Sequence, residues 1–437
     1  MNKKEIRSFG QAFNGKTPSK DEQRSDGLPI LKIRDIDENG QFRGTFGSFV
    51  DQAFYEKHKN KRLRTGDTIV LNAAHNTDYV GSKSAFVPST LNGVIATGEW
   101  LIVRVEDASP AYVNQFLKAP SGRACLKNCV KGIHLYPKDV ERIEIPLPPL
   151  DDQIRIAHLL GKVEGLIAQR KQHLQQLDDL LKSVFLEMFG DPVRNEKGWT
   201  PAPLEQLGSI NRGVSKHRPR NDPKLLGGPH PLIQTGEVSN AGTYITTYTQ
   251  TYSDLGFAQS KLWPAGTLCI TIAANIAKAG ILTFEACFPD SVVGFLAHEG
   301  EANTLYVLGL FWFFQAILEK NAPAAAQKNI NLEILRSLSV PKPPIKLQGE
   351  FATIVEKVEA LKSRYQQSLS DFEALYGALS QQAFKGELDL SRVALPAAPI
   401  EGESPVAAGV PAPIATPVIE LPETDLLLPA MHVLNET

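Results

Sequence analysis

Hydrophobic residues recur with alternating spacings of three and four along two long stretches of this 437-residue chain. Each stretch contains ten such positions, and nine of the ten are apolar in each. The polar exceptions are Arg170 in the first stretch and Lys362 in the second. A 3.5-residue spacing that persists this long is typical of helices packed in a coiled coil. The predicted seam positions are Leu160, Val163, Ile167, Leu174, Leu177 and Leu181 in the first helix, and Val355, Val358, Leu369, Phe372 and Leu379 in the second.

Proline and glycine predict where these helices begin and end. Pro148-Pro149 precedes the first and Pro343-Pro344 the second, and the residue before a proline is pushed out of the helical region. Gly190 and Gly386 follow the last apolar positions, as expected for helix ends. A helix of roughly 35–38 residues would be about 55 Å long and must bury its stripe, for which the other helix is the obvious partner. Arg170 and Lys362 either set the register of this pair or extend their stems along its edge.

The two helices belong to a larger internal repeat. The segment Ile145-Pro-Leu-Pro-Pro-Leu150 recurs as Val340-Pro-Lys-Pro-Pro-Ile345, which is 195 residues further along the chain. Gln153 and Gln348, Lys162-Val-Glu164 and Lys357-Val-Glu359, and Phe189 and Phe384 keep the same offset. Agreement over some forty positions at a fixed offset identifies a duplication.

Each helix follows a globular segment with short β-branched runs, such as Asp67–Leu71 and Gly266–Ile272, and an apolar helical stretch. The expected fold class is α+β, with two mixed α/β globular heads, each followed by a long helix, and with the helices packed as an antiparallel coiled coil. The expected boundaries are 1–145 for the first head, 146–190 for the first helix, 191–340 for the second head and 341–390 for the second helix. Residues 391–437 form a Pro/Ala-rich acidic tail that should be disordered.

Charge is distributed unevenly along the chain, although the net charge is only −2. Residues 1–150 carry 22 Lys and Arg against 17 Asp and Glu, whereas residues 391–437 carry one against six. The first segment is therefore mildly basic, which permits nucleic-acid binding without requiring it. Four cysteines without zinc-ligand spacing favour reduced packing residues. The apolar stretch Thr304–Leu318 is too short to span a bilayer, and no apolar leader follows Met1, so we expect a cytoplasmic protein without membrane contact.

The layout resembles the specificity subunit of Type I restriction–modification systems, the HsdS family. The resemblance rests on Asn128–Gln153 and Asn329–Gln348, where an Ile-Pro-Leu-Pro-Pro-Leu-type junction leads twice into a long helix, and on the Gly15-Lys-Thr-Pro18 turn. It covers nearly the whole chain except the acidic tail, which departs from the family pattern. It implies a non-catalytic subunit whose heads read two halves of a double-stranded DNA sequence. It further implies two methyltransferase subunits docked on the helices, with restriction or motor subunits also joining, and S-adenosylmethionine and ATP bound by those partners rather than by this chain.

Two basic runs are the candidate DNA contacts. Lys57–Arg64 lies in the first head, and Asn211–Arg220 is its counterpart in composition in the second. Lys, Arg and Asn suit phosphate contacts and hydrogen bonds to base edges, although a charge run is more often a solvated surface. The candidate residues are Lys16, Lys57, Lys59, Lys61, Arg62, Arg64, Lys83, Arg212, Lys216, His217, Arg218, Arg220 and Lys278.

One motif suggests a different function. Gly10-Gln-Ala-Phe-Asn-Gly-Lys-Thr17 matches the phosphate-loop pattern G-x4-G-K-[ST] of a nucleotide-binding enzyme. A working phosphate loop needs a buried strand before it and a helix after it, but the flanking residues are polar and lack a helical period. No other catalytic motif and no metal-ligand cluster occurs in the sequence. The alternatives to DNA recognition are thus a phosphate-loop enzyme and a coiled-coil scaffold that does not bind DNA.

Overall fold

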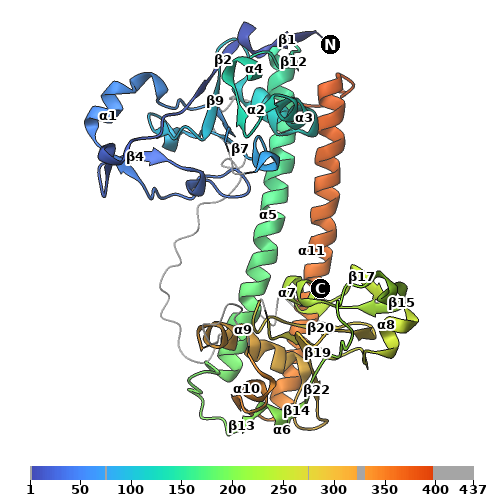
Figure 1. Ribbon diagram of the computed structural model, residues 1–437. Helices are drawn as coiled ribbons and strands as arrows, with labels where there is room; N and C mark the ends of the chain where they lie inside the picture. The colour runs from blue at the N-terminus through green and yellow to red at the C-terminus, as the bar shows by residue number, and fades with distance from the viewer. Residues whose placement is uncertain (1, 74–75, 274, 322–329, 397–437) are drawn as a thin grey trace. The chain divides into compact units, whose positions relative to one another are not determined.

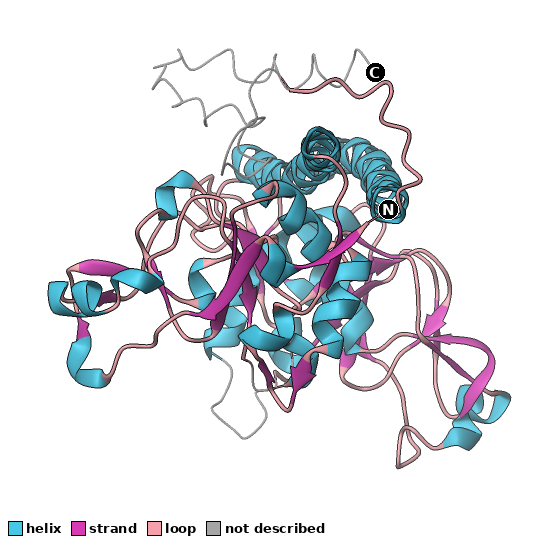
Figure 2. Ribbon diagram, turned by 90° about the horizontal axis from the view of Figure 1, so that it is seen from above, coloured by secondary structure: helices cyan, strands magenta, loops and turns pink. Residues whose placement is uncertain are grey.

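The computed structural model describes residues 2–73, 76–273, 275–321 and 330–396. These residues form two compact units. Unit 1 contains the described residues up to 172 and those from 366 onward, and unit 2 contains residues 173–365. The fold is a mixture of helix and sheet, as predicted (Figure 2). The predicted acidic tail lies outside the described residues from position 397 onward.

Two long helices carry the predicted heptads. Helix α5 spans Leu150–Phe189 and helix α11 spans Ile345–Lys385 (Figure 1). Each begins directly after a proline pair, and each ends at a glycine with a left-handed φ, 77° at Gly190 and 80° at Gly386. The helix ends predicted from proline and glycine are therefore confirmed.

Contacts within each unit show that α5 and α11 are antiparallel. In unit 1 Ile156 near the start of α5 lies with Ala383 near the end of α11, whereas the Arg170 Nε further along α5 donates to Ser368 Oγ at 3.1 Å. In unit 2 Asp178 of α5 pairs with Lys362 of α11 at 2.7 Å, and Phe185, one heptad further along α5, contacts the ring of Phe351, which lies earlier on α11. All eleven predicted seam positions are buried or half-buried. The antiparallel coiled coil of the expected fold is confirmed.

The two polar seam residues both bond to the facing helix. Besides its bond to Ser368, the Arg170 guanidinium lies 5.9 Å from the Phe372 ring centroid. The Lys362 ammonium lies 2.7 Å from Asp178 on α5 and 2.8 Å from Glu359 on its own helix. Burial acts to lower the pKa of Lys362, but the hydrogen bonds to both carboxylates outweigh it and the pKa lies above its ordinary value. These contacts favour the register interpretation over side chains that only extend along the edge.

Each unit contains one head, defined here as head 1 (residues 3–146) and head 2 (residues 201–341). The elements of head 1 are β1 Lys3–Glu5, β2 Gly10–Asn14, β3 Gln23–Arg24, β4 Leu28–Leu31, β5 Phe49–Val50, α1 Gln52–Lys57, β6 Thr68–Leu71, β7 Ser84–Phe86, β8 Ile95–Ala96, β9 Trp100–Val105, α2 Pro110–Lys118, α3 Pro120–Asn128, β10 Val130–Lys131, β11 His134–Leu135, α4 Pro137–Val140 and β12 Glu144–Pro146. Those of head 2 are β13 Pro201–Pro203, α6 Leu204–Leu207, β14 Gly208–Arg212, β15 Leu226–Leu232, α7 Thr235–Asn240, β16 Tyr244–Ile245, β17 Gln250–Tyr252, α8 Asp254–Ala258, β18 Leu262–Trp263, β19 Leu268–Thr271, β20 Ala279–Leu282, β21 Ala286–Cys287, β22 Val292–Ala297, α9 Thr304–Asn321, α10 Leu332–Arg336 and β23 Ser339–Pro341.

The heads share one sheet topology. Head 1 has a sheet of order β2-β9-β6-β7, and head 2 has the same order in β14-β22-β19-β20, extended by β16. A second sheet repeats as well, because β4 pairs in parallel with β8 as β15 pairs with β21. In both heads the entry strand pairs with the exit strand, β1 with β12 and β13 with β23. The chain therefore enters and leaves each head at the same place.

A glutamine and a tyrosine fasten each head to the start of its following helix. Gln153 accepts a hydrogen bond from the Ser109 N–H at 2.9 Å and donates to the Pro148 carbonyl, while Tyr112 donates to the Pro146 carbonyl at 2.6 Å. Head 2 repeats this arrangement with Gln348 and Tyr306, which bond to Asn303, Pro343 and Pro341. Gln153 and Gln348, which lie 195 residues apart in the sequence, thus hydrogen-bond to equivalent backbone groups in the two heads.

Candidate nucleic-acid interface

The structure brings Lys16 to the basic run of head 1. Helix α1 is capped by the Asp51 carboxylate, which accepts from the Phe54 N–H at 2.9 Å, and His58 is its C-cap. The following turn places the Lys61 ammonium 5.1 Å from the Phe13 ring centroid on β2. We call Lys16, Lys57, His58 and Lys61 the basic surface of head 1.

Positive charge is concentrated on this surface. Partial burial, and then the nearby Lys16 charge, lower the pKa of Lys61. Burial together with Lys16 and Lys57 also lowers the pKa of His58. Glu22 lies 3.7 Å from Lys57 and offsets part of this charge. An anionic ligand placed here would stabilise the charged form of Lys61, which its present surroundings destabilise.

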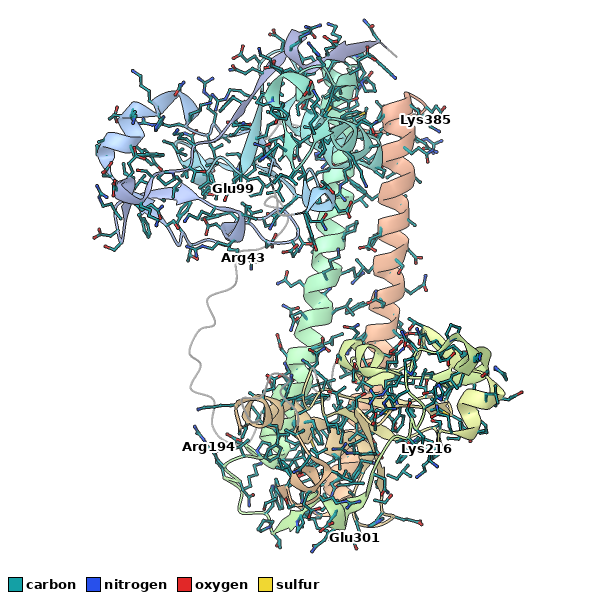
Figure 3. The ribbon with its side chains drawn as sticks, viewed as in Figure 1. Arg43, Glu99, Arg194, Lys216, Glu301 and Lys385 are labelled. Carbon is teal, nitrogen blue, oxygen red and sulfur yellow. The ribbon has the colours of Figure 1, made fainter. Side chains whose placement is uncertain are left out.

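Head 2 has a surface built from the equivalent segments. The Lys216 and His217 N–H groups both donate to the Gln259 side-chain carbonyl, at 2.5 and 2.9 Å, and Gln259 is the C-cap of α8 as His58 is that of α1. Lys261 follows, with its ammonium 4.0 Å from the Trp263 ring centroid. We call Lys216, His217 and Lys261 the basic surface of head 2; Lys216 is labelled in Figure 3.

The two predicted basic runs are counterparts in composition only. β6 of head 1 and β19 of head 2 pair in the same way with β9 and β22, so these two strands are equivalent. Extending this alignment back along the chain makes Gly66 equivalent to Gly266 and Lys61 equivalent to Lys261. The run Lys57–Arg64 therefore corresponds to residues 257–264, whereas the run Asn211–Arg220 corresponds to the segment around Lys16. Each run supplies one half of a surface that is completed in the same head by a segment far away in the sequence. Lys261 was missed because a single lysine among uncharged neighbours forms no run.

Several candidate residues already have partners within the chain. Arg62 pairs with Glu56 at 3.0 Å and lies 5.5 Å from the Tyr55 ring centroid, and His217 pairs with Asp222 at 3.2 Å. Arg218 and Arg220 share Asp290. Lys83 donates to the Ile36 carbonyl at 2.6 Å. A phosphate would have to compete with these groups, so these residues are weaker candidates for backbone contacts.

The other candidates carry charge that no carboxylate within the described ranges neutralises. They lie on different elements: Lys59 and Arg64 flank the turn after α1, Arg212 ends β14, and Lys278 precedes β20. Lys278 in head 2 occupies the position of Lys83 in head 1. The Lys83 carbonyl accepts from the Leu71 N–H on β6, and the Lys278 carbonyl accepts from the N–H of the equivalent residue on β19, Thr271. The unneutralised candidates are Lys16, Lys59, Lys61, Arg64, Arg212, Lys216 and Lys278, to which the structure adds Lys261.

The first five residues of the phosphate-loop motif form a β-strand and no helix follows the motif, which removes the structural basis for the nucleotide-binding alternative. Gly10–Asn14 forms β2, paired antiparallel with β9, and no helix begins at Gly15, Lys16 or Thr17. A Cβ at Gly10 would lie 2.4 Å from the Arg104 carbonyl oxygen, and one at Gly15 would lie 2.3 Å from that of Ala96. Head 2 repeats both glycines as Gly208 and Gly213, against the carbonyls of Leu296 and Phe288. These glycines are explained by close strand packing.

Head 2 also contains an open polar recess of about 670 Å³ between α7 and the segment that includes β16. Its lining includes Gln234, Asn240 and Thr247, whose amide and hydroxyl groups can hydrogen-bond to base edges. Glu237 also lines the recess and accepts hydrogen bonds from the Thr249 N–H and hydroxyl, which fixes its carboxylate locally. The recess is a second polar surface of head 2, in addition to its basic surface.

Other kinds of site find no support in the part of the chain that the structure describes. No group of three or more His, Cys, Asp or Glu side chains there could hold a metal ion. No described helix is both long and apolar enough to cross a membrane. All four cysteines are free thiols, and Cys269 and Cys287 are buried.

Comparison with known proteins identifies the family. The model of the Type I restriction modification DNA specificity domain matches twice, over residues 1–178 and 196–370. A Methanocaldococcus jannaschii protein named as a putative type I restriction enzyme MjaX specificity subunit is 19% identical, over 82% of this chain and 86% of its own length. The StySPI specificity subunit of Salmonella potsdam is 22% identical, over 84% of this chain and 83% of its own length.

Solved structures show the same fold. The S subunit of a Type-I restriction-modification system from M. genitalium aligns with a TM-score of 0.53 at 12% identity, covering 88% of this chain and 96% of that one. A chain from a structure describing complex assembly and conformational transition of the type I R-M system also aligns with a TM-score of 0.53, at 18% identity and with 89% and 98% coverage. Since the family model matches both halves and most of the sequence, this chain belongs to the Type I restriction modification DNA specificity family.

Proposed function

We propose that this chain is the sequence-specific DNA-binding subunit of a Type I restriction–modification complex and reads a bipartite target with its two heads. The observation that carries the proposal is the pair of heads. They share topology and fastening residues but present different side chains on equivalent basic surfaces. Two heads with the same fold but different surface side chains are suited to binding two different half-sites of one duplex.

The chemistry of binding would be divided between phosphate and base contacts. Unneutralised lysines and arginines on both heads can replace the counterions of the DNA backbone, which gives affinity without sequence preference. Side chains such as those of the recess in head 2 can add base-edge hydrogen bonds, at about 1–3 kcal/mol of discrimination for each good bidentate pair. We propose no catalytic residue in this chain; methylation and cleavage would be carried out by partner subunits.

Sequence-selective DNA binding is the first test. We expect the full chain, assembled with its methyltransferase partners, to enrich one split sequence from a pool of random duplexes. Affinity should fall steeply with salt, because each phosphate contact contributes about −0.9 to the slope of log K against log salt. Selection followed by sequencing at two salt concentrations measures both effects. Binding without enrichment would overturn the proposed sequence recognition, and no binding at low salt would favour the coiled-coil scaffold instead.

We further propose that the helices dock two methyltransferase subunits, with a restriction or motor subunit joining the complex. Support comes from apolar side chains left on their outer faces at positions 195 residues apart. Leu180 and Leu375 are 39% and 44% exposed, and Leu150 and Ile345 at the helix starts are 55% and 43% exposed. Because each unit contains one member of each pair, the duplication offers the same apolar contact twice.

Substitution at the paired leucines tests this docking. Leu180→Glu or Leu375→Glu should each remove one of two bound methyltransferase subunits, and the double variant should lose both, because a buried, unpaired carboxylate opposes docking. Co-purified complexes can be weighed by native mass spectrometry. The exposed residue Gln367 offers a control as Gln367→Glu, which should leave two subunits bound. Retention of both subunits by the double variant would show that docking uses another surface.

A further inference from the structure

A lysine occupies the same position on the basic surface of each head. Lys61 stands five residues before Gly66, and Lys261 stands five residues before Gly266, in segments aligned by the pairing of β6 and β19. Both follow the short helix of their head, α1 or α8. The surrounding residues differ between the heads, so the lysine is a shared feature within divergent sequence.

An aromatic ring supports each ammonium group, but the rings come from different elements. Lys61 lies over Phe13 on β2, at 5.1 Å from the centroid, whereas Lys261 lies over Trp263 on β18, at 4.0 Å. A cation over a ring face is stabilised by roughly 0.5–1 kcal/mol at exposed sites. The contact also restricts the rotamers of a long side chain, which lowers the entropy lost when the ammonium binds a ligand. Lysines at the same aligned position are thus supported by rings from unrelated positions in the two heads.

These ammonium groups are also available to an anion. Within the residues that the structure places, neither Lys61 nor Lys261 has an Asp or Glu side chain within ion-pair distance. The neighbours of Lys61 add positive charge, since Lys16 acts on it electrostatically. Lys261 follows Gln259 and Ser260, whose side chains bond the loop that carries Lys216. An approaching phosphate would therefore meet a positioned charge without displacing a carboxylate.

We propose that Lys61 and Lys261 are equivalent DNA phosphate contacts, one in each head, held in place by Phe13 and Trp263. The proposal rests on the proposed DNA-binding function and names two residues that perform the same task in it. Each lysine binds one backbone phosphate and positions its head on the duplex, while other side chains read the bases. The contact is independent of sequence, because phosphate groups are the same in every half-site.

Salt titration of the full chain in its complex tests this assignment. Lys61→Gln and Lys261→Gln should each lower the magnitude of the salt slope by about 0.9 and weaken binding about eightfold at 0.1 M salt, as loss of one released counterion implies. Both duplexes, one with and one without the selected target, should lose affinity by the same factor. The double variant should combine the two losses.

Three further variants separate charge from packing. Lys61→Arg and Lys261→Arg keep the charge and should retain the salt slope. Lys385→Gln removes an exposed charge from α11 and should leave binding unchanged (Figure 3). The proposal is overturned if the Gln variants keep the wild-type slope, if they lose affinity only on the target duplex, or if the Arg variants also lose the slope contribution. If the unsubstituted complex binds neither duplex, the proposed function itself fails, which is a distinguishable result.

Discussion

Exchanging residues 201–341 for the second head of another family member should change one half of the recognised DNA sequence and leave the other half unaltered. The exchange is well placed, because β13 and β23 pair through Pro201 and Pro341, so the chain enters and leaves head 2 at adjacent positions. Head 1 and both basic-surface segments within it remain intact. The original target should then bind far more weakly, since each mismatched base pair costs roughly 1–3 kcal/mol.

The design must preserve the contacts that fasten head 2 within its unit. The Tyr306 ring stacks on Phe185 of α5, and Thr243 donates to Glu359 of α11 at 2.7 Å. The donor head should therefore retain an aromatic residue and a hydroxyl at these two positions. Loss of either would disturb packing and could be mistaken for loss of recognition, so thermal melting of the hybrid accompanies the binding measurement.

The reciprocal exchange of residues 3–146 is the matched control, because β1 and β12 pair in the same way. It should change the opposite half of the target. The readout is selection of random duplexes by the assembled complex, followed by sequencing. A hybrid that selects the original sequence, or one in which both halves change, would contradict the assignment of one half-site to each head.

The long helices were the part of the fold most open to prediction from sequence. A heptad pattern reports directly on burial, and proline and glycine act on the backbone locally, so both ends of α5 and α11 could be placed. The heads were harder, because their strands are short and pair with partners far away in the sequence. β9 lies between β2 and β6, for example, although it follows both in the chain. Local periodicity carries no information on such an order.

The candidate interface was only partly visible in the sequence for a related reason. Basic runs identify charge that is contiguous, and so Lys57 and Lys216 were found, but a surface formed by two separate segments needs the fold. Lys16 reaches the α1 turn through the strand β2, and Lys261 stands alone among uncharged residues. A signal was nevertheless present: Lys-x4-Gly recurs 200 residues apart, at an offset different from that of the helices. Insertions and deletions within the heads changed the offset, which is 200 between β6 and β19 but 192 between β9 and β22, and so hid the match.

One buried pair distinguishes the two heads and leads to the largest expected effect on stability. Arg104 of β9 and Asp67 form a bidentate pair, with Nε–Oδ1 at 2.9 Å and Nη2–Oδ2 at 2.7 Å, and their side chains are only 7% and 2% exposed. In head 2 the aligned positions are Leu296 and Thr267. The same fold thus accepts either a buried ion pair or an uncharged pair at this point.

Asp67→Thr alone should destabilise unit 1 by about 3–5 kcal/mol, because it leaves the Arg104 guanidinium buried without its carboxylate. Adding Arg104→Leu completes the uncharged pair of head 2 and should restore stability to within about 1 kcal/mol of the unsubstituted chain. The hydroxyl introduced by Asp67→Thr can donate to the Arg64 carbonyl, as the Thr267 hydroxyl donates to that of Pro264 at 2.7 Å. Hydrogen exchange of the β9 amides measures the stability of unit 1 directly.

Glu56→Gln is the control, since it removes the half-exposed partner of Arg62 and should cost less than about 1 kcal/mol. The prediction fails if Asp67→Thr is as mild as this control, or if the double variant loses as much stability as the two single variants together.

The outcome also bears on DNA binding, because the Arg104 guanidinium lies 5.0 Å from the centroid of the Phe13 ring that supports Lys61. If Lys61 depends on the ring and not on the ion pair, the double variant should keep the full salt slope while the single variant, with its disturbed β9, should not.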